Sequence, residues 1–295
     1  MFHKFVREFA NRDQAILLLK LVCFLMFAGR GWQLLFWDGP FRAFFWDQNL
    51  LEGIVTSISG LSWEVYVTSD WSEKMIQGLS YMTGLVFALC AIASLTVRLK
   101  SKIGGGVLLL GTGLLVILAL LYMREKFFHI GQFFEYSAQV ASPLFLYLMV
   151  CRKLLPGKLY FWFKLVIALT FSAHGLYAIG YYPRPGNFVD MVIIIFGCTE
   201  AFAHQFLFWA GVLDFIVSVL LFIPATSRWA LMYAFLWGTL TAFARVVANV
   251  DFTFFASTLH QSLYETLYRL PHGGLPFILF LMFKQKHVQK FPHRT

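Results

Sequence analysis

Charged residues are scarce in this chain of 295 residues. Asp, Glu, Lys and Arg make up only 13% of it, whereas 59% is hydrophobic. Soluble domains carry about 25% charged residues, so this composition all but excludes an ordinary soluble enzyme, a disordered tail or a nucleic-acid-binding protein. It indicates a polytopic membrane protein, in which a net charge of +9 is typical of basic residues at the membrane surface.

Signatures of soluble catalysis are also missing. No two of the four cysteines have a C-x-x-C spacing, so we interpret them as small buried hydrophobic residues. The chain has no Walker loop, dinucleotide fingerprint, HExxH motif or nucleophile elbow. Neither His129 with Glu135 nor His260 with Glu265 has the i, i+3 or i, i+4 spacing of helical metal sites. We therefore expect no metal, and whether the chain is an enzyme stays open.

Long apolar runs dominate the chain. A bilayer core requires about 20 apolar residues in a helix, and eight segments qualify, which predicts an all-α fold with about eight transmembrane helices. The last segment is the weakest, because only residues 275–283 are continuously apolar. The segments are residues 15–36, 76–97, 103–123, 127–150, 159–182, 205–223, 229–248 and 259–283.

The longest predicted connection, residues 39–75, is rich in tryptophan. Trp46, Trp63 and Trp71 are suited to the membrane interface, so we expect an amphipathic helix or cap on the outer side. With eight spans both termini lie on one side, and the terminal segments and connections on that side together hold 14 of the 24 Lys and Arg residues. The positive-inside rule then predicts cytoplasmic termini, in a bacterial-type inner membrane.

Two ordered matches indicate an internal duplication. At a shift of 144 residues, Arg30 falls on His174 and Gly31 on Gly175. Residues 129–149 likewise resemble residues 260–282, each with a His, a following Glu and then a Pro before an apolar run. We expect two parallel four-helix repeats, residues 1–156 and 157–295.

The second half resembles the DoxX-like membrane family. Residues 174–191 and 210–232 carry the resemblance, which covers about 130 residues of the second half and, through the repeat, the first half loosely. Gly211 and Asp214 form a small-x-x-acid step and Arg228 stands in a short turn. The resemblance implies a four-helix unit, in a family that includes membrane subunits linked to thiosulfate–quinone oxidoreduction, and it indicates fold more firmly than activity. Phe87 stands roughly where Asp214 would fall in the first half, so the two halves are not equivalent.

Polar and ionisable residues inside membrane spans are functional suspects, because burying them in lipid is costly. On the fourth predicted span, His129, Gln132, Glu135 and Gln139 are spaced to share one helical face. The candidates for ligand binding or ion pairing are Arg30, Arg124, Glu125, His129, Glu135, His174, Tyr177, Asp190, Asp214, Arg245, Asn249, Asp251, His260 and Glu265.

The most specific prediction concerns the burial and the partner of Arg30. This arginine is too deep in its span to reach the surface easily, so we expect it to be buried and paired with Glu135 or Glu125. His174, its repeat counterpart, should then face Glu265 or Asp251 in the second half.

Three interpretations of this outward-opening polar cluster stay open. It could be internal ion pairing, a site for a quinone-like lipophilic ligand, or a proton or ion path. We favour a membrane subunit of a redox or respiratory-type system that contacts quinone. The alternatives are a non-catalytic structural or assembly subunit and a small-solute or ion carrier. The expected partners are the lipid bilayer and other membrane subunits, and no nucleic acid.

Overall fold

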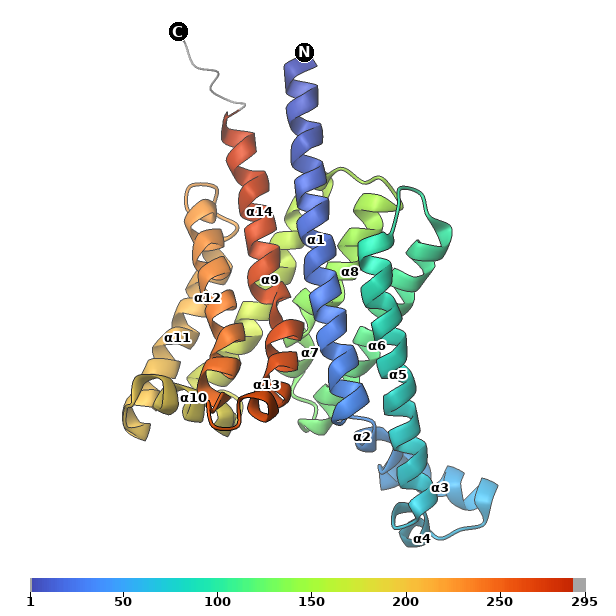
Figure 1. Cartoon of the computed structure of the whole chain (residues 1–295). Helices are drawn as coiled ribbons and strands as arrows, with labels where there is room; N and C mark the ends of the chain where they lie inside the picture. The colour runs from blue at the N-terminus through green and yellow to red at the C-terminus, as the bar shows by residue number, and fades with distance from the viewer. Residues whose placement is uncertain (1, 289–295) are drawn as a thin grey trace.

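The computed structural model describes the backbone of residues 2–288 and the side chains of residues 13–155 and 157–282, and all regular structure in this range is helical (Figure 1). The helices are α1 (Phe2–Phe36), α2 (Arg42–Phe45), α3 (Gln48–Ser59), α4 (Trp63–Val67), α5 (Asp70–Thr96), α6 (Lys102–Glu125), α7 (Ile130–Glu135), α8 (Ser137–Val150), α9 (Pro156–Ile179), α10 (Gly186–Phe196), α11 (Glu200–Leu220), α12 (Ser227–Asn249), α13 (Phe255–Arg269) and α14 (Pro271–Val288).

Six helices in the described part of the chain are long and apolar enough to cross a membrane. They are α1 from Asp13 onward, α5, α6, α9, α11 and α12. Large apolar side chains such as Leu89, Leu110 and Leu240 are exposed on their outer faces, where a bilayer rather than water would cover them. The chain is therefore a multi-pass helical membrane protein.

Two of the eight predicted spans are interrupted. The span predicted at 127–150 forms α7 and α8 from Ile130 onward, and these helices are separated at Tyr136. The span predicted at 259–283 lies in α13 and α14, which are separated at Leu270. Pro271 explains the second break, because proline has no backbone N–H to donate to the carbonyl oxygen of Leu267, although Leu270 itself keeps a helical conformation. No Gly or Pro lies next to Tyr136 to explain the first break. The count of eight spans is not confirmed, and the face predicted from His129 to Gln139 is interrupted at Tyr136.

The segment predicted as an outer cap is mostly helical and consists of α2, α3 and α4, which lie at the end opposite Phe2 (Figure 1). Two arginines fasten it to the bundle. Arg42 pairs with Asp38 and with Glu73 of α5, and the hydrogen bond to Glu73 raises the pKa of the Arg42 guanidinium. Arg124, at the end of α6, pairs with Asp47 and donates to the carbonyl oxygen of Ala43 at 2.8 Å. Arg124 therefore anchors the cap.

Close glycine contacts set two helix pairs. A Cβ on Gly31 of α1 would lie 3.2 Å from the carbonyl oxygen of Gly84 in α5. A Cβ on Gly175 of α9 would lie 3.0 Å from the carbonyl oxygen of Gly211 in α11. Small residues let helix backbones approach this closely, which is how helices associate in lipid, where apolar burial gives little driving force.

The two broken helices contact the opposite half of the chain. Helix α13 packs against α1, where a Cβ on Gly29 would lie 2.7 Å from the backbone nitrogen of Tyr268, and α7 packs against α9 beside Gly131. Figure 1 shows α13 between α12 and α1. The breaks at Tyr136 and Leu270 therefore bring the ends of α7 and α13 into the interior of the bundle.

Candidate functional site

A buried ion pair joins the two interrupted helices. Arg269, the last residue of α13, donates from Nη1 to Oε1 of Glu135, the last residue of α7, at 2.7 Å. His174 of α9 has its Nε2 3.9 Å from the same carboxylate oxygen. The ring of His272, in the first turn of α14, lies 5.2 Å from that of His174. Four elements thus place two histidines and one ion pair together.

A second ion pair lies beside the first. Arg245 of α12 donates from Nη1 to Oε2 of Glu265 in α13 at 2.9 Å, although the arginine is only 4% exposed. Asn249 donates to the carbonyl oxygen of Arg245 at 2.7 Å. These two pairs balance the arginine charges, which is what a cluster of buried ions requires.

Several polar atoms of this cluster have no hydrogen-bond partner among the described residues. They are Nε of Arg245, Nε of Arg269 and Nε2 of His272. The other ring nitrogen of His272, Nδ1, lies 2.7 Å from the carbonyl oxygen of Arg269 and must be the donor in that bond. Neutral His272 therefore offers a lone pair at Nε2, and the two arginines offer N–H donors.

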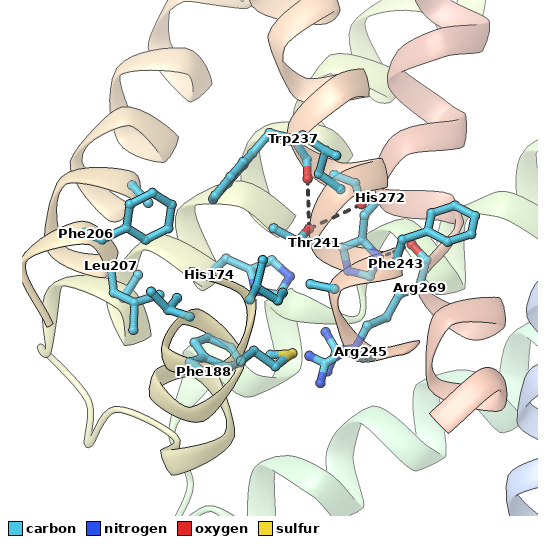
Figure 2. Close-up of a pocket in the computed structure, with 18 of the residues that line it drawn as sticks. His174, Phe188, Phe206, Leu207, Trp237, Thr241, Phe243, Arg245, Arg269 and His272 are labelled. Carbon is cyan, nitrogen blue, oxygen red and sulfur yellow. Dashed lines mark hydrogen bonds between the residues drawn. The ribbon is translucent and has the colours of Figure 1, made fainter. Parts of the chain in front are cut away.

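The cluster forms one end of an apolar cavity of about 340 Å³, which we call the lipid cavity. Its lining residues come from α9 to α14, and Figure 2 shows Arg245, Arg269 and His272 on one side of it and Phe206 and Leu207 on the other. The lining is Phe171, His174, Ala178, Phe188, Met191, Val192, Ile195, Phe196, Phe206, Leu207, Ala210, Asp214, Trp237, Gly238, Leu240, Thr241, Phe243, Ala244, Arg245, Val247, Arg269 and His272. A mostly apolar pocket with a few converging polar groups is the usual form of a small-molecule site.

A smaller, polar cavity of about 260 Å³ adjoins the lipid cavity, and we call it the vestibule. Met191 and Arg245 line both spaces. The vestibule walls also contain Asp190, Asn249 and Glu265. Arg245 therefore stands at the boundary between a hydrophilic chamber and a lipophilic one.

Asp214 lies in the wall of the lipid cavity, apart from the ion pairs. It belongs to α11, is 3% exposed, and its Oδ1 has no hydrogen-bond partner among the described residues. The indole of Trp237 in α12 lies beside the carboxyl group.

Arg30 is buried as expected, at 1% exposure, but its expected acidic partner is wrong. Its Nε and Nη2 donate to Oε1 of Gln139 at 2.9 and 2.8 Å, and Nη1 donates to Oε1 of Gln33 at 2.7 Å. Neither Glu135 nor Glu125 is its partner, because Glu135 is taken by Arg269 and Glu125 is exposed.

Aromatic faces complete the surroundings of Arg30. Its guanidinium lies over the ring of Tyr268 at 3.7 Å from the centroid, and over those of Tyr136 and Tyr122 at 4.8 and 5.7 Å. Cation–π attraction is strongest where the cation is removed from water. Amide oxygens and tyrosine rings thus replace the carboxylate that charge arguments had predicted.

The partner expected for His174 is also wrong. His174 lies beside Glu135 of the first half, whereas Glu265 pairs with Arg245 and Asp251 is exposed in the loop before α13. The Asp251 carboxylate accepts from the backbone N–H of Thr253 at 2.7 Å. The candidates brought together at the lipid cavity and vestibule are Glu135, His174, Asp190, Asp214, Arg245, Asn249 and Glu265.

The remaining candidates lie outside this cluster. His129 stacks on Tyr182 with ring centroids 4.3 Å apart, and the hydroxyl of Tyr177 donates to Gln132 at 3.5 Å. His260 accepts a hydrogen bond of 3.3 Å from the indole of Trp32. These contacts position α7 and α13, and none of them opens onto either cavity.

Sequence reasoning missed Arg269, His272 and Trp237. The first two flank Pro271 in the weakest predicted span, and Arg269 follows Glu265 by four residues, which was an available signal of a polar helix face. Trp237 was one aromatic among many. Comparison with protein families, characterised proteins and solved structures finds no match to this chain, so its function has to be argued from the geometry described above.

Proposed function

We propose that this chain binds a lipophilic, quinone-like molecule in the lipid cavity, as a membrane subunit of a redox or respiratory-type system. The observation that carries the proposal is the position of Arg245. It is buried, its Nε–H has no partner among the described residues, and it stands where the apolar cavity meets the polar vestibule.

A quinone carbonyl fits the polar end of the cavity. An unsatisfied buried donor costs about 1–3 kcal/mol, and the Nε–H groups of Arg245 and Arg269 both lack acceptors among the described residues. A ligand carbonyl would supply one, while the isoprenoid tail would lie among Phe188, Phe206 and Leu207 (Figure 2). The two arginines are already paired with carboxylates, which favours a neutral acceptor over an anion.

The proposed architecture is two parallel four-helix repeats of DoxX-like type. The contact of Gly31 with Gly84 has its counterpart in the contact of Gly175 with Gly211, and both repeats end in an interrupted helix. Helices α1 and α14 have their terminal ends on the same side of the bundle (Figure 1). Because the connections on that side are rich in Lys and Arg, we place them in the cytoplasm of a bacterial-type cell.

A second candidate function, an assembly subunit, is supported by α3. This helix has no buried residue and exposes Leu50, Ile54 and Ile58 at four-residue spacing, on one face. Such a face is suited to another membrane protein. The two functions are compatible, because a quinone-binding subunit would also need a redox partner.

The test is quinone binding by purified protein in lipid nanodiscs. Decylubiquinone is titrated into wild-type protein and into the double variant Arg245→Met with Glu265→Gln, which removes the ion pair without leaving either charge unpaired. We expect the double variant to bind at least tenfold more weakly, as measured by calorimetry. The control is the double variant Arg124→Met with Asp47→Asn, which removes an ion pair of the cap that lines neither cavity, and it should bind within threefold of wild type. Equal binding by the Arg245 and Glu265 double variant would refute the proposal.

A further inference from the structure

Asp214 is a buried acidic residue that takes part in neither of the two ion pairs described above. Its helix packs against α9 through Gly175 and Gly211, whose backbones touch. Helices α9 and α11 are antiparallel, so the residue before Gly175 and the residues after Gly211 both lie further from the cap side of the bundle. His174 is one residue beyond the glycine contact in this direction, and Asp214 is three residues beyond it. At 1.5 Å per residue, Asp214 is only roughly 3 Å deeper in the membrane than His174.

The surroundings of Asp214 indicate that it is uncharged. None of the ion pairs found among the described residues includes it, and the indole of Trp237 is the polar group beside it. The carboxyl group is otherwise enclosed by apolar cavity walls such as Phe171 and Ala210. An isolated carboxylate in such a place takes up a proton instead of staying charged. A neutral carboxyl group carries an O–H donor.

The proposed repeat gives an internal comparison. At the position corresponding to Asp214, the first half has Phe87, which is fully buried and stacks on Phe27 with centroids 5.7 Å apart. The first half therefore packs with an apolar side chain at this place in the bundle. A packing role does not require an acid in the second half, where the position lines a cavity.

We infer that Asp214 is a ligand-binding residue that donates a hydrogen bond, through its unpartnered oxygen, to a second acceptor on the molecule held at Arg245. The inference rests on the proposed function and narrows its ligand class. Hydrogen-bond donors then stand at two separate places along the cavity, at Arg245 and at Asp214. The separation follows from Trp237, which lies beside Asp214 and is eight residues from Arg245 along α12. The fitting ligand has two opposed oxygen acceptors on a flat apolar ring, as a para-quinone does, rather than a single ketone or carboxyl head.

Two probes of similar shape test this geometry. The compound 2,3-dimethyl-1,4-naphthoquinone has two opposed carbonyl oxygens, whereas 2,2-dimethyl-1-tetralone has one. We expect wild-type protein in nanodiscs to bind the quinone at least tenfold more tightly than the ketone. Asp214→Leu should reduce that preference to within threefold by weakening quinone binding alone. Asp214→Asn, which keeps an N–H donor, should retain at least a fivefold preference.

A chemical measurement checks the charge state independently. Dicyclohexylcarbodiimide reacts with protonated carboxyl groups in apolar surroundings, so mass spectrometry should find its adduct on Asp214. Saturating quinone should reduce this adduct at least fivefold, and exposed Asp190 should remain unmodified. This readout needs no variant, so it holds if Asp214→Leu fails to fold.

The possible failures can be told apart. If both probes bind, the Arg245 and Glu265 double variant weakens both, and Asp214→Leu leaves the preference unchanged, then the role of Asp214 is refuted and the proposed function stands. An adduct on Asp214 that quinone does not reduce also refutes its role. If neither probe binds wild-type protein, the proposed function fails, and this inference fails with it.

Discussion

Glu135 accepts a hydrogen bond of 2.7 Å from Nη1 of Arg269, and this bond joins two helix ends that lie 134 positions apart in the chain. The pair closes the interior ends of α7 and α13 and sets the position of His174, whose Nε2 is 3.9 Å from the same oxygen. One ion pair therefore couples the packing of the two halves to the polar end of the lipid cavity.

Breaking this pair should destabilise the protein strongly. In Arg269→Met the Glu135 carboxylate loses its partner, and removing one member of a buried pair costs about 3–5 kcal/mol. Unfolding followed by circular dichroism in mixed detergent should show the loss. The double variant Arg269→Met with Glu135→Gln removes both charges, and we expect it to recover at least half of the lost stability. No recovery would mean that the two residues act independently.

Arg30 should respond more mildly to the same kind of substitution. Its partners are the amide oxygens of Gln139 and Gln33 and the ring of Tyr268, so Arg30→Met leaves neutral groups behind. An unsatisfied neutral acceptor costs about 1–3 kcal/mol. Under the same unfolding conditions we expect Arg30→Met to lose less stability than Arg269→Met. A larger loss would indicate that an acid depends on Arg30 after all.

The fold could be predicted from the sequence where one strong physical requirement acts alone. Apolar length is such a requirement, and it located the six helices that can cross a membrane. The break between α7 and α8 was missed because hydropathy averages over a window and does not register a break at a single residue such as Tyr136. The break at Pro271 could have been predicted, because proline has no backbone N–H to donate within a helix.

The candidate site could likewise be predicted only in part. Which residues are polar and buried follows from the sequence, as for Arg30 and Glu135, but which of them pair does not. Charge arguments matched Arg30 with an acid, whereas the fold places Gln139 beside it and gives Glu135 to Arg269. The pairing depends on the packing of α13 against α1, which cannot be predicted from any local sequence pattern.

Glycine contacts give a test of the helix packing. In Gly31→Leu the new side chain would meet backbone atoms of Gly84 and Ala88 at 3.2 and 3.3 Å, and backbone cannot turn aside as a flexible side chain can. Overpacking of this kind costs about 1–3 kcal/mol. Gly175→Leu, facing Gly211, should cost a similar amount if the halves are repeats. Gly78→Leu is the matched control, because nothing lies within 4 Å of its added Cβ, and it should retain wild-type stability in a thermal melt.

Membrane orientation can be checked with single cysteines in a protein whose four native cysteines are replaced. Ser57 in α3 and Arg98 after α5 are both exposed and lie at opposite ends of the bundle (Figure 1). Because basic residues concentrate on the side of Arg98, the positive-inside rule places that side in the cytoplasm. In intact cells, a membrane-impermeant maleimide should therefore label Ser57→Cys and should label Arg98→Cys only after the cells are permeabilised. The reverse pattern would invert the orientation and would open the vestibule to the cytoplasm.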